Sequence, residues 1–242
     1  MRHYNLWKDY TKQAEQPDWI RVWVYYLVSK IFGLTFGIKL MERGEGKAQA
    51  VYYDISDIMP QSLDIAREED EHEQQLIQMI DEERLNYVGS IMRGLNDALV
   101  ELTGALAGFT LALQHSHLIA MAGLIIGIAA SLSMGATEYL ASKSEESSQT
   151  PLKSALYTGI AYIFTVLFLV FPYLLFANVY ISLGLMIFDA IVVIIVFNFY
   201  ISVAKNISFW KRFSEMVLLS LGIAAVSFAI GFVVKQFLGV EV

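Results

Sequence analysis

Five long apolar segments dominate the C-terminal part of the sequence. Each approaches the roughly twenty residues that a helix needs to cross a bilayer. The segments are about Leu95–Leu113, Leu118–Leu140, Leu152–Phe176, Val179–Ala204 and Ser214–Val234. Segments of this length and apolarity are typical of membrane-spanning helices, and 56% of the whole chain is hydrophobic, which is too much for an ordinary soluble domain. The sequence therefore predicts an all-α membrane protein with a five-helix transmembrane domain.

Charged residues divide the chain near Arg93. Residues 1–93 hold 16 of the 24 acidic and 11 of the 17 basic residues. We therefore expect two domains, a polar and net-acidic helical domain at 1–93 and a membrane domain at 94–242. The chain has no cysteine, which excludes disulfides and thiolate metal sites, so a bound metal would need oxygen, imidazole or thioether ligands.

The distribution of Lys and Arg predicts the orientation in the membrane. Basic residues gather in the second and fourth loops of the membrane half: Lys143, Lys153, Lys205, Lys211 and Arg212. The turns at 114–117 and 177–178 have none. Because short basic loops stay on the cytoplasmic side, and because the N-terminus has no signal peptide pattern, we expect a cytoplasmic N-terminus and an external C-terminus.

Two carboxylates and a second polar pair mark the first two apolar segments. Asp97 and Glu101 are four residues apart, and so are Met134 and Glu138. On a helix, residues at this spacing share one face. An ionisable residue inside a membrane is a functional-site hypothesis by default. We therefore predict that Asp97, Glu101, Met134 and Glu138 line a path for a cation.

Small residues and one further carboxylate complete the pattern of the membrane half. Gly104 and Gly108 form a small-xxx-small pair, a spacing that lets helix backbones approach closely in lipid. Asp189 lies inside the fourth segment, where a charge is costly without a partner. Two interpretations of Asp189 stay open, a role in proton coupling and a structural hydrogen bond to a neighbouring helix.

The N-terminal domain offers weaker metal-site candidates. Residues 62–90 are expected to form one polar helix, in which Glu69 and His72 make a Glu-x-x-His pair of the kind found in di-iron bundles. Trp19–Glu42 is expected to form another helix, with Glu42 at its end as a possible third ligand. Hydropathy alone would allow Trp23–Ile38 to be a sixth span, but its three basic residues favour a bundle or membrane-surface helix.

The first two membrane segments resemble a known family. The runs Gly94-Leu95-Asn96-Asp97-Ala98-Leu99-Val100-Glu101, Gly104-Ala105-Leu106-Ala107-Gly108 and Ser133-Met134-Gly135-Ala136-Thr137-Glu138-Tyr139 look like the vacuolar iron transporter family. The resemblance implies a dimer with five membrane helices per chain, which exports Fe2+ and often Mn2+ from the cytosol in exchange for protons. It also implies that Asp97, Glu101, Met134 and Glu138 handle the ion.

The N-terminal domain resembles the ferritin-like, rubrerythrin-like domain of prokaryotic members of that family. The short loop at 144–150 takes the place of the glutamate-rich insert of plant and yeast-type members. His3 looks like the histidine of the first Glu-x-x-His, whose glutamate would lie one residue before Met1. Three explanations stay open: a truncated gene start, two chains that pair their half-bundles, or a domain that no longer binds two irons.

The sequence as a whole predicts a metal exporter rather than an enzyme. Fe2+ or Mn2+ would collect on the acidic domain, with Glu42, Glu69, His72 and His3 as metal ligands, and a di-iron site would form if the bundle is completed. The expected partners are metal ions, membrane lipid and a second copy of the chain, with no nucleic acid, in a prokaryotic cell membrane. The alternative is a membrane-anchored di-iron oxidase or peroxidase that works through Glu42, Glu69 and His72.

Overall fold

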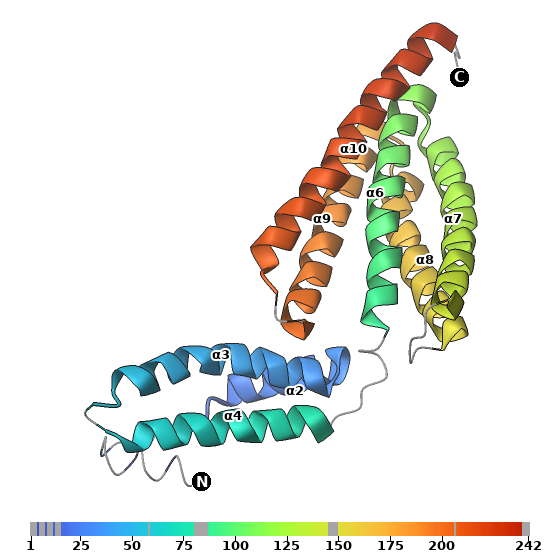
Figure 1. Cartoon of the computed structure of the whole chain (residues 1–242). Helices are drawn as coiled ribbons and strands as arrows, with labels where there is room; N and C mark the ends of the chain where they lie inside the picture. Colours follow the sequence, from blue (N-terminus) through green and yellow to red (C-terminus); the bar gives the residue numbers. More distant parts are fainter. Residues whose placement is uncertain are drawn as a thin grey trace. The chain divides into compact units, whose positions relative to one another are not determined.

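The computed structural model describes residues 4, 8, 12, 16–57, 59–79, 87–144, 150–205 and 207–238. Those residues form helices and contain no strand, which confirms the all-α prediction for the described part of the chain. Eight helices have defined bounds (Figure 1): α2 Trp19–Phe32, α3 Leu34–Asp54, α4 Gln61–Met79, α6 Val88–Leu113, α7 Ser116–Ser144, α8 Pro151–Leu175, α9 Val179–Ala204 and α10 Phe209–Leu238.

The chain forms two compact units. Unit 1 comprises Met1–Glu82 with Val203–Asn206, and unit 2 comprises Glu83–Ser202 with Ile207–Val242. The structural boundary therefore lies about ten residues before the domain boundary predicted at Arg93, because α6 already begins at Val88.

Helix α6 is the central helix of unit 2, since it packs against α7, α8 and α10, and α7 also packs along α8. The side chains of Leu99, Leu102 and Leu106 on α6 are fully buried. They share one core with residues of α8 and α9, among them Val166, Leu169, Met186, Ala190 and Ile194. Three helices thus pack against α6, and α9 contributes to the same core, through the apolar side chains that the sequence of α6 places between its polar positions.

Glycines set the close approach of α6 to its neighbours. A Cβ added at Gly108 would lie 3.0 Å from the backbone oxygen of Ser227 on α10, and one at Gly94 would overlap the backbone oxygen of Thr158 on α8. On α7, Gly123 leaves room for Leu106 of α6, since a Cβ there would lie 2.7 Å from its side chain. The packing role that the small-xxx-small spacing predicts is therefore confirmed at Gly108.

Four helices of the described residues, not five, are long and apolar enough to cross a membrane, so the prediction of five was wrong by this measure. The four are α7, α8, α9 and α10. Helix α6 has 26 residues and therefore sufficient length. It fails on apolarity because Arg93, Asn96, Asp97 and Glu101 occupy its first half.

Unit 1 contains α2, α3 and α4, with α3 packed against the other two. The single helix expected at Trp19–Glu42 was wrong, because Gly33 divides it into α2 and α3. Gly33 has φ 101° and ψ 154°, a backbone conformation that is essentially restricted to glycine. Glu42 consequently lies inside α3, which continues to Asp54, and does not end a helix as predicted.

The polar helix expected at 62–90 corresponds to α4, which begins at Gln61 and is described to Met79. Residues 80–86 lie outside the described residues. The expected end of this helix was wrong, because residues 88–90 belong to α6, which begins at Val88. Three described helices in unit 1 agree with a helical domain, whereas its ferritin-like character stays a prediction.

Candidate cation site on helix α6

One face of α6 carries the charged residues that the sequence predicts to be functional. Ser90, Arg93, Asp97 and Glu101 recur at intervals of three or four residues, so they lie one above another along the helix. Gly104 continues the same face, where it packs against Ile223 of α10. The first half of this face is therefore polar, and the second half is a helix-packing surface.

Glu138 of α7 is held by the beginning of α6. Its carboxylate is 3% exposed and forms an ion pair with Arg93, whose Nε donates a hydrogen bond of 2.7 Å to Oε2. The hydroxyl of Ser90 donates to Oε1 at 2.8 Å, and Ser142, one turn along α7, lies at 3.5 Å from the same oxygen. Burial of a carboxylate is costly unless its charge is paired and its oxygens accept hydrogen bonds, and both conditions hold here.

Asp97 and Glu101 are in a different situation, because both side chains are exposed. Glu101 Oε2 accepts a hydrogen bond of 2.7 Å from the hydroxyl of Tyr162, a fully buried residue of α8. Asp97 makes no hydrogen bond or ion pair with any residue that the structure describes. With Glu138 neutralised by Arg93, Asp97 and Glu101 are left with two negative charges one helical turn apart.

The structure brings the predicted path residues together only in part. Glu138 does meet α6, but at Ser90 and Arg93, which lie one to three turns before Asp97 and Glu101. Met134 is half-buried and packs against the apolar core. The four-residue path thus consists of an exposed carboxylate pair on α6 and a paired carboxylate on α7, and its function as a path stays a prediction.

Sequence reasoning missed three residues of this site: Ser90, Arg93 and Tyr162. Arg93 had a signal, because it lies four residues before Asp97 and therefore on the same face of the helix. Tyr162 had none, since a tyrosine in an apolar helix is most simply a core residue. Its hydroxyl reaches Glu101 only because α8 packs along α6.

The N-terminal metal candidates do not form a recognisable site among the described residues. Glu42 lies on α3, and Glu69 and His72 lie on α4, which packs against α3. The side chains of Glu42 and His72, and all of His3, lie outside the described residues. Within the described part of the chain, no group of three or more His, Asp and Glu side chains could hold a metal ion.

Asp189 is a further carboxylate of unit 2, and it lies apart from Asp97 and Glu101 on another helix. Asp189 on α9 is half-buried and makes no hydrogen bond or ion pair with the described residues, so neither interpretation of its role gains support.

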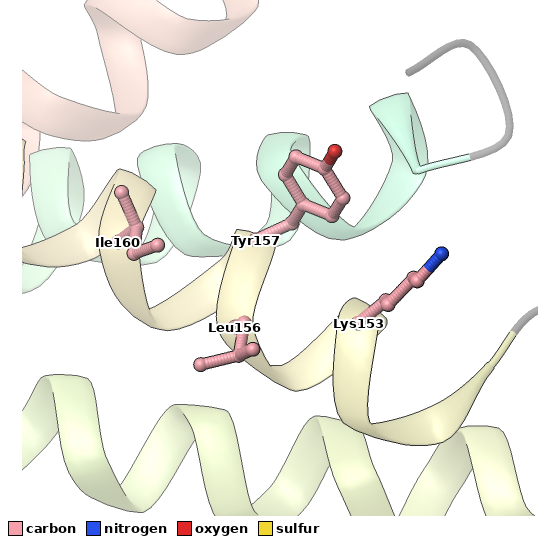
Figure 2. Close-up of a pocket in the computed structure, with 4 residues that line it drawn as sticks. All are labelled: Lys153, Leu156, Tyr157 and Ile160. Atoms are coloured by element: carbon pink, nitrogen blue, oxygen red, sulfur yellow. The ribbon is translucent and has the colours of Figure 1, made fainter. Parts of the chain in front are cut away.

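A shallow pocket is lined by Lys153, Leu156, Tyr157 and Ile160, which Figure 2 shows on successive turns of α8. It contains no carboxylate, and the structure gives it no connection to Asp97 or Glu101.

Comparison with known proteins agrees with the resemblance of the first two helices. The model of the VIT family matches residues 88–150. The match covers α6 and α7, with Asp97, Glu101, Met134 and Glu138 inside it. It does not extend to α8, α9 and α10. No curated protein matches the chain.

Proposed function

We propose that this integral membrane protein transports a divalent transition-metal ion, Fe2+ or Mn2+, out of the cytosol in exchange for protons. The proposal is supported by the match of residues 88–150 to the VIT family and by four helices apolar enough to span a membrane. Carboxylates suit divalent metal ions and release them on protonation, which is one physical basis for exchange with protons.

The exposed carboxylate pair on α6 is the observation that carries this proposal. Asp97 and Glu101 stand one turn apart on a helix whose other residues pack against apolar helices. Charges in such surroundings need water, a partner or an ion. Their two negative charges match one divalent cation, and Tyr162 fixes the position of one oxygen of Glu101.

Arg93 gives this site a positive charge that can be exchanged. In the structure Arg93 neutralises Glu138, and its own side chain remains 52% exposed, so the guanidinium can swing into solvent. In our proposal an incoming cation takes the place of Arg93 at Glu138, and Met134, one turn earlier on α7, supplies a thioether ligand that favours iron-like ions. The arginine thus restores the charge balance whenever the ion is absent.

We further propose that the transporter is a homodimer. Asp97 and Glu101 are exposed in a single chain, and a second copy related by a two-fold axis would place a second pair opposite them. Such an arrangement would enclose the ion between protein side chains instead of leaving the carboxylates in lipid.

The direct test is transport by the purified full chain in proteoliposomes. Under a pH gradient, wild-type vesicles are expected to take up Fe2+ or Mn2+, and Asp97→Asn or Glu138→Gln should abolish uptake. Asp57→Asn is the matched control, because Asp57 is an exposed carboxylate in the turn after α3. Wild-type uptake by the Asp97→Asn/Glu138→Gln protein would contradict the assignment, provided that its helical content and detergent elution are unchanged.

Cysteine labelling tests the orientation, since the chain has no native cysteine. If α6 crosses the membrane as part of the bundle, His115→Cys between α6 and α7 should react with an impermeant reagent from outside. Lys143→Cys and Lys211→Cys should be protected until the membrane is opened. Labelling of Lys211→Cys from outside would overturn the proposed cytoplasmic N-terminus.

The di-iron oxidase or peroxidase remains the alternative prediction. No contact among the described residues favours it, and consumption of oxygen or peroxide by the iron-loaded full chain would be its signature. Loss of that consumption in Glu69→Ala, with uptake of the ion preserved, would show an enzyme activity in addition to transport.

A further inference from the structure

Helix α2 exposes an apolar surface that the other described helices of unit 1, α3 and α4, do not cover. None of its 14 residues is buried. The residues facing α3, among them Tyr25, Val28 and Ser29, are half-buried, while the opposite side is open. The exposed side carries large apolar and aromatic side chains: Trp19, Ile20, Trp23, Val24, Leu27 and Ile31, each at least 50% exposed. A contiguous apolar surface of this kind marks an interaction site.

The length of α2 excludes a spanning helix. Fourteen residues of α-helix extend about 21 Å, whereas a bilayer core is about 30 Å thick. Gly33 prevents α2 from continuing into α3, because its backbone conformation has φ 101°. A helix that is too short to cross a membrane and too apolar for water is suited to the boundary between the two.

The charges of α2 favour an anionic lipid surface. The helix contains Arg21 and Lys30 and no acidic residue, although Asp18 caps its first turn and pairs with Arg21. In the same unit, α4 carries an acidic run from Glu68 to Glu71. Basic residues combined with exposed Trp and Tyr are the composition of helices at membrane interfaces.

Chain connectivity keeps this helix within reach of a bilayer. Residues 80–87 join α4 to α6, and eight residues can span at most about 28 Å. Helix α6 belongs to the unit that holds the four apolar helices of spanning length. When unit 2 is embedded in a membrane, the link therefore keeps unit 1 close to a lipid surface and raises the effective concentration of that surface.

We propose that α2 lies flat on the surface of the membrane in which unit 2 is embedded, with Trp19, Trp23 and Leu27 inserted at the headgroup level and Arg21 and Lys30 against anionic headgroups. This anchor would hold the acidic helices of unit 1 beside the membrane, whatever ion or substrate the protein handles. The inference is thus independent of the proposed transport function.

A spin label can test the contact in the full chain reconstituted in vesicles of two parts phosphatidylcholine to one part phosphatidylglycerol. Leu27→Cys places the label in the middle of the exposed face of α2. Glu71→Cys is the control, because Glu71 is an exposed residue of the acidic helix α4. Molecular oxygen concentrates in lipid, whereas a water-soluble nickel chelate stays in the aqueous phase, so the ratio of their collisions with the label reports whether the label lies in lipid or in water. We expect the ratio of oxygen to nickel collisions to be at least fivefold higher at position 27 than at position 71. Equal ratios would overturn the proposal.

A second copy of the chain is the competing occupant, and the same label distinguishes it. If α2 packs against α2 of another chain, the label at position 27 should be shielded from both reagents and show spin–spin broadening, which would also overturn the proposal. In a second variant, Arg21→Glu/Lys30→Glu, we expect the collision ratio at position 27 to fall at least twofold. An unchanged ratio there would contradict the part assigned to anionic headgroups.

Discussion

Helices α2 and α6 are both rich in apolar residues, yet they have opposite surroundings. Helix α2 has no buried residue, whereas α6 has twelve, several of them fully buried. Among the described helices, α2 packs against α3, where Ser29 lies close to Gly37. Helix α6 instead packs against α7, α8 and α10, and Gly94 and Gly108 let α8 and α10 approach its backbone. Apolar composition alone therefore does not decide which helix is buried.

The two units also differ in how they use an arginine–carboxylate pair. Arg93 meets a buried carboxylate in unit 2, and Arg21 meets an exposed one in unit 1. Arg93→Gln should lower the free energy of unfolding by about 3 kcal/mol, because it leaves Glu138 charged and buried. Arg21→Gln should cost less than about 0.5 kcal/mol, since exposed pairs contribute little. Unfolding of each variant in mixed micelles measures both values.

The double variant Arg93→Gln/Glu138→Gln sharpens this result. Removing both charges should restore most of the stability that Arg93→Gln loses, because no unpaired charge remains. If the double variant is as unstable as Arg93→Gln, packing of the arginine stem and not its charge holds this end of α6.

Glycine substitution probes the close packing of unit 2. Gly94→Ala should destabilise the protein by about 2 kcal/mol, because the added Cβ would meet the backbone of α8, which cannot rotate away. Gly222→Ala is the matched control, since nothing lies within 4 Å of its added Cβ. It should be neutral or stabilising by up to about 1 kcal/mol through helix propensity. Equal effects of the two changes would falsify the close approach of α8 to α6.

Gly33→Ala should affect unit 1 alone. An alanine at φ 101° is strained by roughly 1–2 kcal/mol. The junction of α2 and α3 should therefore open at a lower denaturant concentration than in the wild-type protein. In a Trp210→Phe background the remaining tryptophans, Trp7, Trp19 and Trp23, all belong to unit 1 and report on it by fluorescence. Gly184→Ala serves as the control, because Gly184 is in unit 2 with nothing within 4 Å. A matching shift in the unfolding of unit 2 would show that the units unfold together.

Tyr162→Phe should lower the free energy of unfolding by about 1 kcal/mol, because it removes one hydrogen bond to the exposed Glu101. Its effect on ion uptake is more informative. With Glu101 no longer positioned, the ion concentration at half-maximal uptake should rise severalfold while the maximal rate changes less. Tyr180→Phe is the control, because the Tyr180 hydroxyl accepts a long hydrogen bond of 3.5 Å from Gln114 at the exposed end of α9, far weaker than the bond it is compared with. Uptake indistinguishable from wild type would remove Tyr162 from the site.

The sequence alone predicted much of the membrane half. Apolar runs set the position of α7, α8 and α9 to within a few residues, because the length of an apolar run follows the thickness of the bilayer. Asp97, Glu101 and Glu138 were selected as candidate site residues because a carboxylate in such a run is unusual, and their role stays a prediction. The start of α6 was missed by seven residues, since Ser90 and Arg93 carry no apolar signal and their side chains contact Glu138 of α7 instead of lipid or core.

What the sequence by itself determined is the position of the apolar helices α7, α8 and α9 and the charged positions of the membrane half, because both follow from local spacing and from the cost of charge in lipid. Only the tertiary structure decided that Glu138 forms an ion pair with Arg93, whereas Asp97 and Glu101 form none with the described residues. Arg93 is four residues from Asp97 in the sequence, but it reaches across to Glu138 because α7 packs beside the first turns of α6. In the same way Gly33, a single residue with positive φ, turned one expected helix into two and left α2 with its apolar face uncovered. Pairing and exposure depend on which helices become neighbours, and spacing along one helix carries no information about that.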